Sequence, residues 1–218
     1  MIKAVLFDFD GTLANTNPLI IRSFEETFAL MLTDRTLTRA EILDCIGPTL
    51  EQTGAIYFPD NPNKFVETYR ELNSQYHDEM IELYSGMPEM LEALKKMNLK
   101  LAIVSSKRRD FVIRGLEQTQ LYHFFDYIVA ADDVMNPKPH PEPIEKAMGH
   151  YGFTPDECLM VGDNSHDIEG AKNAGVKAIA VGWALKGVDY LKTLNPDYLV
   201  MDAAEIVKIV KEIDDNDN

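Results

Sequence analysis

The chain has 218 residues, of which 45% are hydrophobic and 26% are charged, and this composition is typical of a globular protein with a full hydrophobic core. It carries 36 Asp and Glu against 21 Lys and Arg, for a formal net charge of −15. This balance argues against a nucleic acid or an anionic membrane as partner, because both need a basic surface. No apolar run approaches the roughly 20 residues that span a bilayer. Two widely separated cysteines, Cys45 and Cys158, are typical of a reducing compartment, so we expect a cytoplasmic protein.

Short apolar runs alternate with helical patterns along most of the chain. The runs lie at Ala4–Phe7, 101–104, 127–131, 159–161 and 178–181, with a weaker sixth at Tyr198–Val200. They lack the strict alternation of half-buried strands, which predicts strands that are buried on both faces. Helical stretches at 88–97, 110–119, 141–151 and 168–174 separate them. The pattern predicts an α/β fold with a Rossmann-like parallel sheet in a three-layer α/β/α core.

Residues 18–84 break this alternation because they contain much helical pattern and no convincing strand. Residues 17–32 are apolar at helical spacing, Thr38 and Glu41 form a capping box for a helix ending near Gly47, and residues 63–83 read as one long amphipathic helix. We therefore predict two domains, a catalytic core of residues 1–16 and 85–218 and an all-helical cap of residues 17–84. The acidic residues 214–218 are expected to form a frayed tail.

Polar side chains follow four of the predicted strands. In chain order they are Asp8 with Asp10, Ser105, Lys138, and Asp163 with Asp167. Residues two apart in a strand face the same side, about 6.6 Å from each other, so the first pair of acids can reach one site. Open parallel sheets bind ligands beyond the carboxyl ends of their strands. We therefore expect all these groups to converge at one edge of the sheet.

This set of side chains suits one kind of chemistry. Clustered carboxylates repel one another unless a cation lies among them, and oxygen-only ligands favour a hard ion such as Mg²⁺. A serine hydroxyl and a lysine ammonium suit phosphate oxygens. One carboxylate can attack phosphorus while a second acts as general acid and then base. The sequence predicts Mg²⁺-dependent phosphoryl transfer from a small phosphate-containing substrate.

The ordered pattern resembles the haloacid dehalogenase superfamily of phosphatases over nearly the whole chain. The elements that carry the resemblance are D-x-D-G-T from residue 8, a serine after the second strand, a lysine before a proline, and G-D-x-x-x-D from residue 162. The resemblance implies that Asp8 is the nucleophile and a metal ligand. It implies that Asp10 is the acid and base with its carbonyl on the metal, and that Thr12 orients the acid and the phosphoryl group. It assigns phosphate binding to Ser105 and Lys138, and metal binding to Asp163 and Asp167.

Smaller details are similar to the bacterial inorganic pyrophosphatase and phosphoglycolate phosphatase branch of that family. They include Asn15-Thr16, the "IGPTL" stretch around Gly47, and Asn164 where Thr or Ser is usual. The implied reaction is hydrolysis of pyrophosphate to two phosphates, with Gly47 facing the substrate. Cations for the distal phosphate would come from Lys107 together with an arginine, either Arg109 or one of the cap residues Arg22 and Arg70. A small phosphomonoester such as 2-phosphoglycolate is the alternative substrate, and a sugar-phosphate mutase is a third possibility.

Other interpretations of the same residues stay open. Asp167 could cap the helix that follows it, residues 107–109 could form a solvated helix face, and His140 and His166 could be loop-packing residues. Phosphoryl-accepting receiver domains also place acids and a lysine at strand ends, but they lack a large helical insertion and an acid two residues after the nucleophile. We expect the protein to be a monomer or a homodimer.

Overall fold

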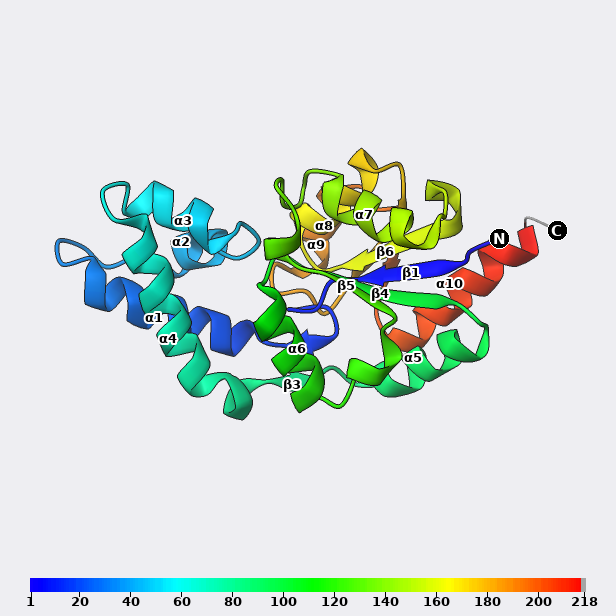
Figure 1. The fold of residues 1–218 in the computed structure, drawn as a ribbon, viewed down its shortest axis with the longest axis horizontal. Helices are drawn as coiled ribbons and strands as arrows, with labels where there is room; N and C mark the ends of the chain where they lie inside the picture. Colours follow the sequence, from blue (N-terminus) through cyan, green and yellow to red (C-terminus); the bar gives the residue numbers. More distant parts are fainter. Residues whose placement is uncertain (217–218) are drawn as a thin grey trace.

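The computed structural model describes residues 1–216, which contain a six-stranded parallel sheet (Figure 1). Its strands are β1 (Ala4–Phe7), β4 (Lys100–Val104), β5 (Tyr127–Val129), β6 (Cys158–Gly162), β7 (Lys177–Val181) and β8 (Tyr198–Val200), in the order β5-β4-β1-β6-β7-β8. The central strand β1 pairs with β4 on one side and with β6 on the other. All six predicted strands are confirmed, although β5 ends two residues early, where a short 3₁₀ turn (Ala131–Asp133) begins.

Two layers of helices cover the sheet, which confirms the three-layer prediction. Val5 and Phe7 of β1 face one apolar cluster, built with helices α5 (Met87–Lys96), α6 (Arg109–Gln118) and α10 (Ala203–Asn216). Ala4 and Leu6 face the other, built with α7 (Glu142–Tyr151), α8 (Ser165–Asn173) and α9 (Gly187–Thr193). Successive residues of a strand point to opposite faces, so a strand covered on both sides must be apolar at every position. This explains the unbroken apolar run.

The inserted segment forms helices α1 (Asn17–Met31), α2 (Arg39–Asp44), α3 (Leu50–Tyr57) and α4 (Pro62–Met80), which extend from one end of the sheet layers (Figure 1). They share a third apolar cluster around Phe24, Phe28 and Phe65. A two-stranded sheet of β2 (Ala14–Asn15) and β3 (Glu82–Leu83) joins the two connecting segments. All the buried residues of this cluster come from the insertion, and Leu185 of the core packs against it. On this basis we propose the two-domain division at residues 16 and 85.

The structure corrects several predicted boundaries. Helix α2 ends at Asp44 and not near Gly47, and the long helix ends at Met80 because residues 82–83 pair as strand β3. Helices α3, α9 and α10 were not predicted, nor were the 3₁₀ turns at Tyr122–Phe124 and Pro155–Glu157. The frayed tail is wrong for residues 214–216, because α10 continues through them and the backbone N–H of Ile2 donates to Asp214 Oδ1 at 2.6 Å. Residues 217 and 218 lie outside the described part.

Within residues 1–216, every helix is too short or too polar to cross a lipid bilayer. Both cysteines are buried and carry free thiols.

Candidate active site

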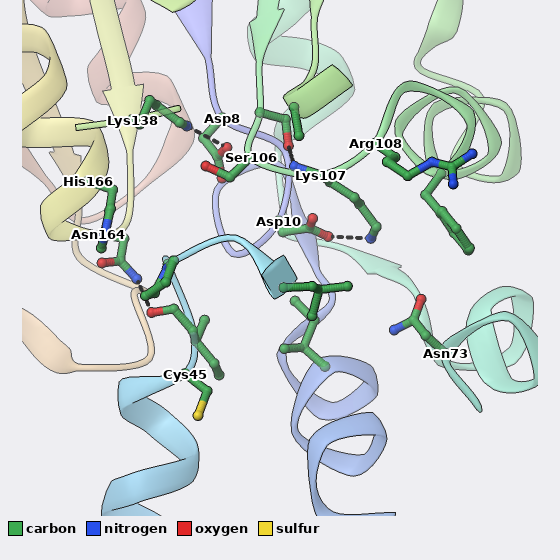
Figure 2. Close-up of a pocket in the computed structure, with 18 of the residues that line it drawn as sticks. Asp8, Asp10, Cys45, Asn73, Ser106, Lys107, Arg108, Lys138, Asn164 and His166 are labelled. Atoms are coloured by element: carbon green, nitrogen blue, oxygen red, sulfur yellow. Dashed lines mark hydrogen bonds and ion pairs between the residues drawn. The ribbon is translucent and has the colours of Figure 1, made fainter. Parts of the chain in front are cut away.

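A buried ion-pair network lies at the carboxyl ends of the central strands (Figure 2). The ammonium of Lys138 donates to Asp8 Oδ1 at 2.9 Å, to Asp167 Oδ1 at 2.5 Å and to the carbonyl of Val104 at 2.7 Å. Lys138 is only 3% exposed, and a buried charge is tolerated only when its partners are this complete. The network joins segments that lie 130 residues apart in the chain.

Asp163 completes a group of three buried carboxylates. Each of Asp8, Asp163 and Asp167 offers one carboxylate oxygen, and these three oxygens lie within 4.8 Å of one another. The first loop makes room for this group through Gly11, which has φ +80°, and a Cβ there would lie 2.3 Å from Asp163 Oδ2. The donor set is oxygen only, which fits a hard divalent cation and does not fit a thiolate- or imidazole-bound metal.

Burial and mutual repulsion raise the pKa values of Asp8 and Asp163. Burial raises the pKa of Asp8 to about 7; Lys138 opposes this shift, and Asp167 and Asp10 add to it. Burial also raises the pKa of Asp163 well above its ordinary value, with further contributions from Asp167 and Asp8. Burial alone would lower the pKa of Lys138, but its two carboxylate partners outweigh this effect and raise it. A cation among the acids would offset the same repulsion.

Asp10 points away from that group. Its Oδ1 lies 2.9 Å from the ammonium of Lys107, as the dashed line in Figure 2 shows. Lys107 comes from the loop between β4 and α6, where its backbone N–H also donates to the hydroxyl of Ser105 at 3.2 Å. Asp10 and Lys107 remain partly exposed to the pocket. The two acids that follow β1 therefore face two different surroundings, the carboxylate cluster for Asp8 and a lysine for Asp10.

Asp167 contacts both the start of the helix that follows it and the ion-pair network. Its Oδ2 accepts a hydrogen bond at 3.1 Å from the backbone N–H of Asn164 at the start of α8, while its Oδ1 pairs with Lys138. Gly162 allows this close approach, because a Cβ at that position would lie 2.2 Å from the Asp167 Cβ. Helix capping and participation in the site are therefore compatible.

A pocket opens over this network between the core and the inserted helices. Its core wall includes Ser105 and Lys107 as well as the acids and Lys138. Its cap wall is mostly apolar and includes Ile20, Phe24, Ile46, Pro48 and Leu50. Gly47 also lines it. The segments predicted to face a substrate thus meet across one cavity.

Thr12 does not line the pocket, unlike the predicted nucleophile, acid, phosphate-binding and metal-binding residues. It is 1% exposed, and its hydroxyl has no hydrogen-bond partner in the part of the chain that the structure describes. Its carbonyl accepts a hydrogen bond at 3.0 Å from the Trp183 indole. Thr12 therefore lies beneath the site, and any effect on the phosphoryl group would pass through the loop that it belongs to.

Two of the arginines proposed for a distal phosphate lie elsewhere. The Arg109 guanidinium pairs with Asp133 at 2.5 Å, and Arg22 pairs with Glu26 at 2.8 Å; neither residue lines the pocket. Arg70 does line it, while its guanidinium pairs with Glu51 at 2.8 Å.

Pocket residues that sequence reasoning missed include Tyr69 and Asn73. Tyr69 and Asn73 are four residues apart on α4, so they share one face of the helix, and that spacing could have flagged them. Arg108 also lines the pocket and directly precedes α6; it belongs to the basic run 107–109, in which Lys107 was the preferred candidate. Of the histidines, His166 lines the pocket, whereas His77 and His140 do not.

Fold and site together define a parallel α/β protein with a buried acidic cluster at the ends of its central strands. The sequence profile described as haloacid dehalogenase-like hydrolase matches residues 5–181. The chain is 46% identical over 209 residues to "Pyrophosphatase PpaX" of Halalkalibacterium halodurans, covering 96% of this chain and 97% of that protein. It is 42% identical over 211 residues to "Pyrophosphatase PpaX" of Listeria monocytogenes, covering 97% of each. The chain belongs to the haloacid dehalogenase-like hydrolase family.

Solved structures agree with this assignment. A haloacid dehalogenase-like hydrolase from Bacteroides fragilis aligns with a TM-score of 0.85 at 26% identity, covering 94% of this chain and 100% of that one. A predicted phosphoglycolate phosphatase from Haemophilus somnus aligns with a TM-score of 0.80 at 25% identity, covering 96% of this chain and 98% of that one.

Proposed function

We propose that the protein is a Mg²⁺-dependent phosphatase that forms an aspartyl phosphate and hydrolyses inorganic pyrophosphate to two phosphates. The observation that carries the phosphatase assignment is the Lys138 ammonium held between Asp8 and Asp167 at the end of the central strands. The names of the relatives at 42% and 46% identity carry the choice of pyrophosphate.

The chain's own residues supply a nucleophile and an acid. A carboxylate oxygen of Asp8 attacks phosphorus, a P–O bond to the leaving phosphate breaks, and Asp10 protonates the departing oxygen. Water then attacks the aspartyl phosphate, Asp10 takes the proton from that water, and the second phosphate leaves with Asp8 restored. Lys138 and Ser105 bind the phosphoryl oxygens, and Lys138 also offsets the negative charge on Asp8.

The proposed metal ligands are Asp8, Asp163 and Asp167, together with the backbone carbonyl of Asp10. When bound, Mg²⁺ supplies positive charge for the carboxylates and for the phosphoryl oxygens. The oxygen-only donor set within 4.8 Å supports this choice.

Besides Lys138, three cations line the pocket and support an anionic distal group. Lys107, Arg70 and Arg108 line it from both walls, and the phosphate that does not react carries negative charge that they can bind. Gly47 lies on the cap side of the same cavity. We propose that these residues, with Thr12 acting through its loop, select the substrate.

A small phosphomonoester such as 2-phosphoglycolate is the second candidate. The apolar cap wall favours it, because Phe24, Ile46 and Leu50 can contact the carbon atoms of an ester, which pyrophosphate lacks. The Haemophilus somnus structure described as a phosphoglycolate phosphatase points the same way.

The deciding experiment compares phosphate release from pyrophosphate and from 2-phosphoglycolate with Mg²⁺ and with EDTA. We expect a higher kcat/KM for pyrophosphate and no turnover in EDTA. A higher kcat/KM for 2-phosphoglycolate would select the second candidate, and full activity in EDTA would contradict the metal assignment.

We further propose a cytoplasmic location, since two buried free thiols suit a reducing compartment. We predict a monomer or a homodimer, and light scattering would distinguish the two by their mass.

A further inference from the structure

Asn164 lies where the acid-bearing loop of the core meets the cap. It directly follows Asp163 and is only 8% exposed. The backbone of Asn164 makes two hydrogen bonds within the core loop: its N–H donates to Asp167 Oδ2, and its carbonyl accepts from the Asp167 N–H, both at 3.1 Å. These bonds depend on the main chain, so a substitution at position 164 can leave them in place.

The side chain of Asn164 makes a different contact. Its Nδ2 donates to the carbonyl of Ile46 in the cap at 3.2 Å, and its Oδ1 accepts from the hydroxyl of Ser165 at 3.1 Å. Figure 2 shows the amide reaching from the core loop to the cap segment, beside His166. A Ser or Thr side chain is shorter and has no amide donor, so it could not replace this bond.

Gly47 makes the contact possible from the cap side. It has φ +121°, and a Cβ there would lie 2.8 Å from His166 Nδ1 and 3.1 Å from both amide atoms of Asn164. The cap backbone therefore rests directly on Asn164 and His166. Ile46 and Gly47 line the same pocket as Asp163, so the contact forms part of the wall that encloses a bound substrate.

We propose that Asn164 is a positioning residue that latches the cap loop at Ile46 and Gly47 onto the loop that carries Asp163 and Asp167. This inference rests on the proposed function, because it assigns the latch to closure over a bound phosphate. The main chain of Asn164 contacts the carboxylate cluster at Asp167, and its side chain contacts the cap at Ile46. Cap closure over a substrate excludes water and completes the site.

Asn164→Ser tests the latch by removing the amide donor and keeping the main-chain bonds. We expect KM for pyrophosphate to rise roughly 3- to 10-fold, which is the effect of losing one hydrogen bond, with kcat and the Mg²⁺ requirement little changed. With Mg²⁺ and inorganic phosphate present, the backbone amides within residues 45–49, where Pro48 has none, should exchange hydrogen faster than in the unchanged protein. Asn63→Ser, at an exposed position of α4, is the matched control.

Gly47→Ala disturbs the same contact from the opposite side. We expect a similar rise in KM for pyrophosphate. In the double variant, the rise in KM should be smaller than the product of the two single rises, because the two residues share one contact. Independent effects, or Asn164→Ser with unchanged KM and unchanged exchange, would overturn the latch. A lower unfolding midpoint together with weaker Mg²⁺ binding would assign Asn164 a purely structural role instead.

The exchange measurement separates this inference from the proposed function. If the unchanged protein fails to hydrolyse pyrophosphate, the proposed substrate is wrong. Faster exchange at residues 45–49 in Asn164→Ser would still support the latch in that case, and unchanged exchange would reject it.

Discussion

The two walls of the pocket are built in different ways. The core wall consists of charged groups that hold one another at short distances, such as Lys138 with Asp8 and Asp167. The cap wall consists mainly of apolar side chains that belong to, or pack against, the cap's own aromatic cluster. The core wall can therefore carry the chemistry, because its charges are buried and hold one another in place, and the cap wall can contribute to the selection of a substrate.

The difference also concerns stability. The core wall concentrates buried carboxylates with raised pKa values, which costs folding free energy, whereas the cap wall is stabilised by the burial of aromatic rings. The comparison predicts that substitutions in the two walls will have different consequences.

The largest effect is expected at the nucleophile. Asp8→Asn keeps the size of the side chain and removes the attacking oxygen, so activity should fall by more than about 1,000-fold without loss of the fold. Phosphate release and circular dichroism measure the two properties. Asp60→Asn, at an exposed cap position, should retain full activity. Near-normal turnover in Asp8→Asn would show that Asp8 is not the nucleophile and would contradict the assignment of the chemistry to the core wall.

Lys107→Met asks whether selection depends on charge. Removing the ammonium should lower kcat/KM for pyrophosphate roughly 10- to 100-fold, which corresponds to a lost charge-assisted hydrogen bond. The loss for a small monoester should be less, because it has no second phosphate. Equal losses for both substrates would show that Lys107 acts through its pairing with Asp10 and not on the distal group.

Phe65→Ala tests whether the cap is a separate domain. Phe65 is fully buried in the cap cluster, and its truncation should cost about 3–5 kcal/mol. If residues 17–84 form their own domain, hydrogen exchange should accelerate in α1–α4 and leave the parallel sheet protected. Ile103→Ala, in the buried centre of β4, should loosen the sheet instead. A uniform loss of protection in both variants would indicate a single cooperative unit.

The smallest expected effect concerns stability at high pH without metal. The pKa of Asp163 is raised in the fold, so the folded protein holds this proton more tightly than the unfolded chain, and stability falls as the pH rises above the ordinary value of 3.8. Asp163→Asn removes this penalty. In EDTA at pH 8 it should therefore unfold a few degrees higher than the unchanged protein, and the gap should narrow at pH 5.

Calorimetry with and without Mg²⁺ completes that measurement. Added Mg²⁺ should stabilise the unchanged protein more than Asp163→Asn, because the variant lacks one proposed ligand. Equal stabilisation of both proteins would argue against Asp163 as a ligand.

The order of residues along the chain was enough to predict the sheet and the candidate side chains at its edge. Burial on two faces requires unbroken apolar runs such as Ala4–Phe7, and these runs predicted the strands. Because the carboxyl ends of parallel strands share one edge, the sequence also grouped Asp8, Lys138 and Asp163. Local capping signals such as Thr38 with Glu41 also marked the start of α2 correctly.

Only the tertiary structure decided which neighbours those residues meet. Asp10 pairs with Lys107 while Asp8 joins the carboxylates, a division that spacing along a strand cannot reveal. Arg109 is held by Asp133, and Asn164 reaches the carbonyl of Ile46. Each of these contacts joins segments that are distant in the chain, and they depend on side-chain direction and on the placement of the cap, which no local pattern of residues encodes.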